Sequence, residues 1–457
     1  MNKIKLIIKK WLKFLSKIFS LLILSALLES FISQHSNNLN LNIDYLNIQK
    51  TINCTFQDKL NDKIKLGILT YTIKNGGRAK ITALLINYFY KIRIFDIYLF
   101  TKTFKEENEY QIPKEIKRIT IKNNFEYIIR KYDLDILVYE YDDVNEIRLL
   151  NNVTKPKVIF YQHASTFYWI YKNFSLFKDL YSSYKSSKYV ISMIPFEANY
   201  LLKNWGINSI MMENFVSYQY NNIIQSDLSK KIILMLGRGN DKLKRFDLGI
   251  NAMEYISKDV CDSYIYIITN MTYSSKLKNL VSNLNLVNNI KFFDFSTTPE
   301  IYFKNISLNY FLSITESFGL VLCETKMYGI PNILMGIDYT LISKGGTYII
   351  FDDKPETLAK VSINILKNHS RLKILSNNAR RSLKRFNNHD LINKWVKLIL
   401  YILNGIKLKK NISNRIENYK DIINRQLILL GSRVSNLKIK LEHFSNFTFL
   451  QENTFKI

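Results

Sequence analysis

Short apolar runs alternate with longer helical stretches along most of this chain, and the alternation occurs twice. This is the pattern of repeated strand–helix–strand units, whose crossover helices require parallel strands that are buried on both faces. The first half predicts strands at residues 65–70, 94–100, 116–121, 136–139, 158–161 and 189–193. The second half predicts strands at 232–236, 264–268, 290–293, 310–314, 332–335 and 348–351. We therefore expect two open α/β sheets.

The segment between the two halves, residues 214–225, is polar and rich in turn residues, which predicts a hinge. A first domain is thus expected at 63–225 and a second at 226–403. Neither half carries a Gly-x-Gly-x-x-Gly dinucleotide fingerprint. Open α/β sheets bind ligands outside the carboxyl ends of their strands, so we expect a ligand cleft between the two domains.

Beyond these domains, the apolar residues of segment 416–441 recur every three to four positions. This spacing indicates an amphipathic helix, so 404–457 is predicted to be a C-terminal helical extension. The helix could dock on its own domain, form a coiled coil or lie on a membrane.

The N-terminus has lysines at several positions from 3 to 17, followed by an uncharged apolar run at 18–28. This order is typical of a signal peptide or signal anchor. The run is shorter than the roughly 20 residues that span a bilayer. Residues 1–33 are interpreted as a membrane anchor or signal segment and 34–62 as a linker or stem. Membrane association at the endoplasmic reticulum or Golgi is expected, with the orientation open; a docked soluble helix is the alternative.

The composition argues against disorder, nucleic-acid binding and a disulfide framework. The chain has 457 residues, 47% of them hydrophobic, which excludes wholesale disorder. The net charge of +27 would suit nucleic acid or an anionic surface, but the Lys and Arg residues are spread among many Asn and Ile. No long basic tract or zinc spacing is present, so no nucleic-acid partner is expected. Cys54, Cys261 and Cys323 are too scattered for a disulfide framework.

Two acids in the second half, Glu316 and Glu324, are separated by seven residues. Glu316 follows the strand predicted at 310–314, and a helix is predicted at 320–328. Because Glu324 lies one to two turns along that helix, it is close enough to accept hydrogen bonds from vicinal hydroxyls.

The turn between the two acids is Ser-Phe-Gly. The backbone amides of Phe318, Gly319 and Leu320 would point out of the helix N-terminus, where an anion is favoured. An acid, an anion site and a second acid suit a ligand made of sugar, diphosphate and ribose in sequence. This stretch therefore predicts a nucleotide-sugar site.

Two cations follow the first strand of the second half. Arg238 lies at the strand end, and Lys244 lies near the start of the next helix, with Lys242 as a weaker alternative. Fixed cations stabilise the charge that develops on a departing diphosphate. Asp133-Leu134-Asp135 precedes a strand instead of following one, so no metal-binding acid pair is predicted.

The first half offers further candidates at its strand ends. Gly76 and Gly77 precede a helix predicted at 81–90, and tandem glycine lets amides approach a phosphate or sugar closely. His163 follows the strand predicted at 158–161, where a histidine is by itself more often structural than catalytic. Asp142 and Asp143 also follow a predicted strand and are weaker candidates for contact with an acceptor.

These motifs resemble those of the family 4 retaining glycosyltransferases, and the resemblance covers residues 64–403. It implies the GT-B fold, in which two Rossmann-like domains face a cleft. By this resemblance Glu316 and Glu324 are the paired glutamates, and Arg238 and Lys244 contact the diphosphate. The glycine loop faces the donor, and His163 faces the donor sugar.

The resemblance further implies metal-independent transfer of a hexose or N-acetylhexosamine from a UDP- or GDP-sugar, with no cofactor. The acceptor would be a glycan, lipid or protein bound by the first domain. The glycine loop around Gly76 and Gly77 is shorter than in the family, which leaves the identity of the transferred sugar undecided. The alternatives are a non-catalytic transferase-like subunit of a membrane complex and a basic surface binder. The intact Glu316, Glu324, Arg238 and Lys244 argue against the non-catalytic subunit. Binding that fell steeply with salt and ignored nucleotide sugars would favour the surface binder.

Overall fold

The computed structural model describes residues 63–405 except 75, 122–124, 173, 195–196, 199–200, 203–204, 217–222, 240–241 and 337–344. The segments expected to be a membrane anchor (1–33) and a stem (34–62), and all but the first two residues of the helical extension, lie outside the described residues. Within the described part of the chain, no helix is long and apolar enough to cross a bilayer.

In the first domain, the described strands form one parallel sheet in the order β3-β2-β1-β4-β5-β6-β7. The strands are β1 (Ile64–Thr70), β2 (Phe95–Thr101), β3 (Lys117–Thr120), β4 (Ile136–Tyr139), β5 (Lys157–Tyr161), β6 (Val190–Ser192) and β7 (Ile210–Met211). The helices are α3 (Gly77–Ile92), α4 (Phe125–Lys131), α5 (Val144–Asn151), α6 (Thr166–Lys172) and α7 (Phe174–Tyr184). The central strands β1 and β4 are buried, apart from Lys65 near the start of β1, because helices cover both of their faces.

In the second domain, the described strands again form a parallel sheet, in the order β10-β9-β8-β11-β12-β13. The strands are β8 (Ile232–Leu236), β9 (Tyr264–Thr269), β10 (Ile290–Asp294), β11 (Ile306–Phe311), β12 (Asn332–Met335) and β13 (Thr347–Ile350). The α-helices are α9 (Phe246–Asp259), α10 (Ser275–Asn283), α11 (Leu320–Met327), α12 (Pro355–Leu366), α13 (His369–Ser382) and α14 (Asn388–Leu403). Short 3-10 helices are η1 (Leu228–Lys230), η2 (Lys242–Lys244), η3 (Met271–Tyr273), η4 (Pro299–Asn305) and η6 (Leu383–Arg385).

Two predicted boundaries were wrong. The strand predicted at 310–314 is β11, which begins at Ile306 and ends at Phe311. The start of this strand was hidden in the sequence because Ser307 and Asn309 are polar, yet both are buried. The helix predicted at 81–90 begins at the second glycine itself, Gly77.

The strand order in each sheet reverses direction at its centre. In the first sheet the reversal lies between β1 and β4, and in the second between β8 and β11. Such a switch point leaves a crevice outside the carboxyl ends of the two strands, where ligands of these folds bind. The loops that follow these four strands therefore define where a site should be sought.

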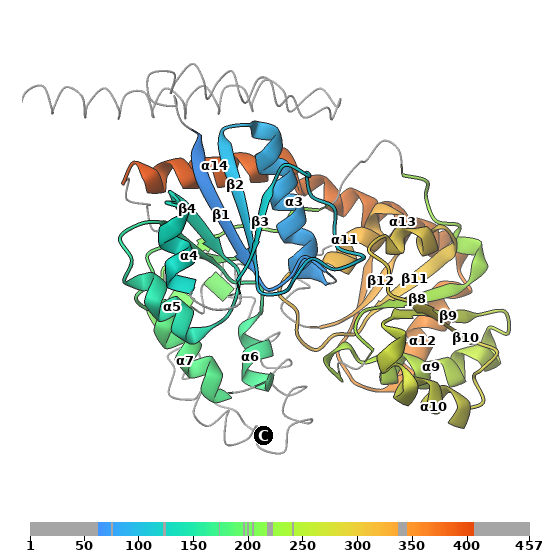
Figure 1. Ribbon diagram of the computed structural model, residues 1–457. Helices are drawn as coiled ribbons and strands as arrows, with labels where there is room; N and C mark the ends of the chain where they lie inside the picture. The colour runs from blue at the N-terminus through green and yellow to red at the C-terminus, as the bar shows by residue number, and fades with distance from the viewer. Residues whose placement is uncertain are drawn as a thin grey trace, which may run out of the picture.

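The last described helix, α14, returns from the second domain to the first (Figure 1). Trp395 of α14 is fully buried, and its ring lies edge-on against Tyr161 at 5.2 Å and Phe89 at 6.1 Å between centroids. At the start of α14, Asn388 donates to the Tyr88 hydroxyl at 2.8 Å. The sequence places residues 388–403 in the second domain. In the structure, the apolar face of this helix packs against the first domain.

Candidate active site

The first acid of the predicted glutamate pair, Glu316, forms an ion pair with Lys244. Lys244 ends η2 in the connection that follows β8, and Glu316 lies in the loop after β11. The backbone ties these two segments together, because Ile314 N donates to Leu243 O at 3.0 Å. The Lys244 ammonium also lies 5.9 Å from the centre of the Phe311 ring. Residues from two separate motifs thus meet at the switch point of the second sheet.

The other cation predicted after β8 is Arg238, which is exposed two residues beyond the strand. Lys242, the alternative to Lys244, is exposed at the start of η2. Because Lys244 is half-buried and paired with Glu316, the geometry favours Lys244 as the inner cation.

The turn before α11 has the shape that an anion site needs. Gly319 caps the helix with a φ of 76°, a left-handed conformation that is free of strain only for glycine. Phe318 is buried and packs edge-on against Phe386, with 5.7 Å between ring centroids. The turn is therefore fixed, and the amides of the first turn from Leu320 are presented to the cleft.

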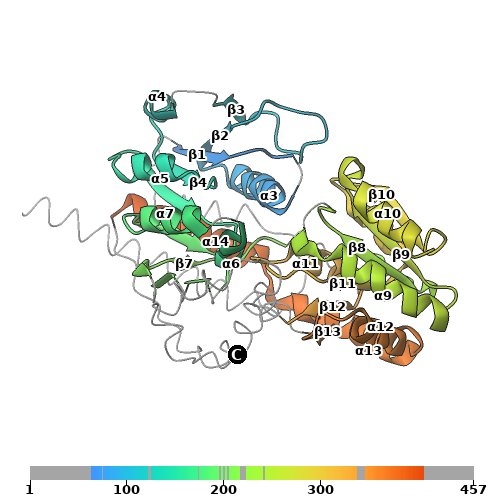
Figure 2. The ribbon, with the colours of Figure 1, turned by 90° about the horizontal axis from the view of Figure 1, so that it is seen from below.

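The glycine loop of the first domain lies opposite this helix start. Gly76 caps α3 with φ 90° and ψ 166°, a backbone conformation that is open to glycine. A Cβ atom added to Gly77 would lie 3.3 Å from Leu320 Cδ1, so the two loops touch across the domains. The views in Figures 1 and 2 both place α3 and α11 side by side between the two sheets. Two positive helix ends thus converge on the cleft.

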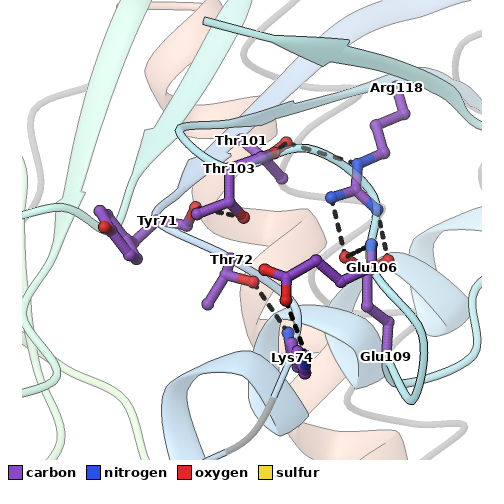
Figure 3. Close-up of polar contacts among 8 residues, drawn as sticks. All are labelled: Tyr71, Thr72, Lys74, Thr101, Thr103, Glu106, Glu109 and Arg118. Carbon is purple, nitrogen blue, oxygen red and sulfur yellow. Dashed lines mark hydrogen bonds and ion pairs between the residues drawn. The ribbon is translucent and has the colours of Figure 1, made fainter. Parts of the chain in front are cut away.

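The loop from β2 to β3 fastens the glycine loop in place (Figure 3). Lys74, two residues before Gly76, donates to Glu106 Oε2 at 2.7 Å, and its amide donates to Thr72 Oγ1 at 3.1 Å. Arg118 of β3 binds Glu109 of the same loop through both terminal nitrogens. Since a bidentate pair has a fixed geometry, the middle of the loop is held by Arg118 on one side and by Lys74 on the other.

The second acid of the pair, Glu324, is buried and engaged by a residue that the sequence analysis did not single out. Lys80 of α3 donates to Glu324 Oε1 at 2.7 Å and to Glu300 Oε1 at 3.2 Å. Burial alone would lower the pKa of Lys80, but Glu324 and Glu300 raise it above its ordinary value. Burial, together with the same acids, raises the pKa of Tyr110 to about 12, which places this tyrosine beside the cluster.

His163 lies buried at the carboxyl end of β5, as predicted, but it is accompanied by an acid that sequence reasoning missed. Glu140 follows β4 directly, and its Oε1 lies 3.6 Å from His163 Nε2. Thr82 of α3 donates to the other carboxylate oxygen, while the Tyr161 ring lies 4.2 Å from the imidazole. Within the described residues, neither Glu140 Oε1 nor His163 Nε2 has a hydrogen-bond partner. The position of Glu140 directly after a strand was the signal that could have found it.

Asp142 and Asp143, the weaker candidates, mainly organise the first domain. Asp142 accepts from Arg78 at 2.6 Å, next to Gly77. Asp143 caps α5 by accepting from the Glu146 amide at 2.9 Å. Both lie at the same sheet edge as Glu140.

A contact between the domains brings the His163 and Glu316 loops together. Ser165 Oγ lies 2.6 Å from Thr315 Oγ1, and both side chains are buried. Ser165 is two residues from His163, and Thr315 precedes Glu316. In the described part of the chain, no three His, Cys, Asp or Glu side chains are grouped so that they could hold a metal ion.

Comparison with known proteins agrees with this arrangement. Residues 219–382 match the family described as glycosyl transferases group 1. The protein is a glycosyltransferase. This confirms the predicted class of enzyme, and the match falls on the domain that carries Glu316 and Glu324. No curated protein matches the chain.

Solved structures that resemble this glycosyltransferase share its two-domain GT-B fold. Sucrose-phosphate synthase from Thermosynechococcus elongatus superposes with a TM-score of 0.64 and 13% identity, covering 75% of this chain and 100% of that one. Alr3699/HepE from Anabaena, in complex with UDP and glucose, has a TM-score of 0.61 and 12% identity, covering 74% and 99%. A TarM variant from S. aureus, with UDP and glycan ligands, has a TM-score of 0.52 and 19% identity, covering 60% and 57%.

Proposed function

We propose that this glycosyltransferase moves a hexose or N-acetylhexosamine from a UDP- or GDP-sugar to an acceptor, with retention of anomeric configuration and without a metal. The observation that carries the proposal is the Lys244–Glu316 pair beside the N-terminus of α11. A sugar-orienting acid, a cation and an anion site are thereby gathered at one switch point.

The donor would lie along the second domain. Its diphosphate would contact the amides of the α11 start, Lys244 and Arg238, since these groups carry positive charge. Its ribose would lie near Glu324, and its sugar between Glu316 and His163. The complexes of Alr3699/HepE and TarM contain UDP, which supports UDP as the first nucleotide to test.

In the proposed reaction, the bond between the anomeric carbon and the β-phosphate oxygen breaks, and its electron pair stays on the phosphate. The acceptor hydroxyl oxygen bonds to the anomeric carbon on the same face, and its proton passes to the departing phosphate oxygen. Lys244 and Arg238 stabilise the charge that grows on the leaving group, which is the usual way to lower the barrier of such a step.

The test is donor turnover by the full chain with UDP-glucose, UDP-N-acetylglucosamine and GDP-mannose, followed by proton NMR. The enzyme should release the sugar from at least one of these donors. The first sugar to appear should have the same anomeric configuration as it had in the donor. Lys244→Met should slow this release by on the order of a hundredfold, because a transition-state charge contact is lost.

Lys242→Met is the matched control, since Lys242 is exposed on the same short helix, and its rate should stay near that of the wild type. An unchanged rate in Lys244→Met would remove Lys244 from the mechanism. Initial release of the opposite anomer would contradict retention.

A further inference from the structure

An aromatic pair, the exposed Tyr71 and the half-buried Tyr141, lies at the carboxyl edge of the first sheet. Tyr71 directly follows β1 and Tyr141 follows β4 by two residues, and these strands are neighbours at the switch point. Their rings are stacked, with centroids 5.6 Å apart and planes inclined by 28°. The Tyr71 residue is 48% exposed. Figure 3 shows its ring turned away from the polar residues that hold the glycine loop.

The pair is held in position by the backbone and by one lysine. Tyr71 O accepts from Lys102 N at 3.0 Å and from Thr103 N at 3.2 Å. The Lys102 ammonium lies 5.7 Å from the centre of the Tyr141 ring and pairs with Glu146. A ring that is fixed and exposed at a ligand-binding edge loses little entropy when it contacts a ligand.

Contacts within the first domain connect the pair with the proposed donor site. Tyr141 precedes Asp142, which binds Arg78 at 2.6 Å. Arg78 follows Gly77, and Gly77 faces Leu320 at the start of α11. The aromatic pair therefore lies on the first-domain side of the cleft, next to the loop that faces the donor.

Polar groups surround the two rings. The pKa of Tyr141 is raised, first by burial and then by Asp143 and Glu146, so carboxylates lie close to its hydroxyl. An aromatic face bordered by hydrogen-bonding groups matches a pyranose ring, which has a C–H face and hydroxyls around its rim.

We propose that Tyr71 and Tyr141 form the acceptor subsite and that the acceptor is a saccharide, whose pyranose ring stacks on the exposed face of Tyr71. Asp143 accepts hydrogen bonds from the hydroxyls of this ring. The proposal deepens and rests on the proposed function, because it names the class of acceptor that receives the sugar.

The experiment measures binding of the full chain to a printed array of pyranose-containing glycans, and then the affinity for the best-bound glycan. Tyr71→Ala should weaken this affinity on the order of tenfold, and Tyr71→Trp should retain it, because a large ring suffices for stacking. Tyr255→Ala is the matched control: Tyr255 is 37% exposed on α9 of the other domain, so this change should leave glycan binding unaltered.

UDP affinity of each variant, measured by calorimetry, separates the two proposals. Glycan binding that is lost in Tyr71→Ala while UDP affinity persists supports the acceptor subsite. A wild-type protein that binds glycans through Tyr71 but binds no UDP- or GDP-sugar would overturn the proposed function and leave the saccharide-binding subsite supported. The saccharide subsite is overturned if the wild type binds no glycan, if Tyr71→Ala binds as well as the wild type, or if Tyr71 is instead needed for binding to phosphatidylglycerol vesicles.

Discussion

Lys326 is a buried lysine on α11, the helix that also carries Glu324. It is 1% exposed, and its ammonium donates to Ser382 Oγ at 3.3 Å. Burial lowers the pKa of Lys326 to about 7; the nearby Cys323 opposes this change and Arg385 adds to it. The helix that presents the anion site therefore carries a buried lysine that changes its charge near neutral pH.

This burial predicts a pH-dependent stability. In the unfolded chain Lys326 has its ordinary pKa of 10.5, so between pH 7 and 10.5 the unfolded state binds more protons than the folded state. The free energy of unfolding should rise with pH across this window, and below pH 7 the cost of the buried charge is fully present. Lys326→Met should raise the free energy of unfolding at pH 7 by on the order of a few kcal/mol and flatten this rise.

Urea denaturation at pH 7 and pH 9.5 measures the effect. Lys373→Met is the control, because Lys373 is exposed on the neighbouring α13. If Lys326→Met and the wild type gain the same stability between the two pH values, the lysine is not the titrating group.

At the scale of elements, the start of α11 depends on one glycine. Gly319 has a φ of 76°, and a Cβ there would lie 3.3 Å from Leu322 Cδ1 and from Phe311 Cζ. Gly319→Ala should lower the free energy of unfolding by about 1–2 kcal/mol, the cost of a left-handed conformation for a residue with a side chain. It should also reduce donor turnover at least several-fold, because the first-turn amides would shift.

Gly206→Ala is a matched control for the strain. Gly206 has a φ of 67°, but a Cβ added there would meet no atom within 4 Å, and this glycine is not part of the site. This variant should lose similar stability and keep its turnover per folded molecule. Equal turnover in Gly319→Ala would show that the geometry of the helix start is not critical.

The elements that the sequence predicted well are those whose side chains repeat one simple pattern. The central strands are buried on both faces, so they appear as continuous apolar runs. β11 was placed too late because two of its buried residues are polar. Ser307 donates to Leu228 O at 2.8 Å, and Asn309 donates to Asn332 Oδ1 at 2.6 Å. Such hydrogen bonds permit polar residues in a core, but the partners are distant in sequence.

The candidate site was predictable where it follows local motifs and was missed where it depends on the meeting of domains. Glu316, Lys244 and Gly319 belong to recognisable turns, and the structure brings them together. The contact between Lys80 and Glu324 joins residues 244 positions apart, and no local pattern indicates it. Likewise, the apolar stripe of α14 predicts burial but not the sheet that it covers.

At the scale of the whole molecule, charge holds the two domains together across the cleft. Lys80 of the first domain lies between Glu324 and Glu300 of the second, with side-chain exposures of 13%, 7% and 25%. Removal of one partner from such a pair leaves an uncompensated buried charge. The wild-type contact should therefore favour a closed arrangement of the empty enzyme.

Lys80→Met should destabilise the protein by about 3 kcal/mol and open the cleft, because the attraction of Lys80 for Glu324 and Glu300 across the domains is lost and both acids are left without a cation. Small-angle X-ray scattering should give a larger radius of gyration for this variant than for the wild type. Lys74→Met is the control, since Lys74 pairs with Glu106 inside the first domain at 2.7 Å and should leave the scattering unchanged. A second change, Glu324→Gln, should partly restore the stability of Lys80→Met by removing the unpaired charge. Identical scattering from Lys80→Met and the wild type would mean that closure depends on α14 and the Ser165–Thr315 contact instead.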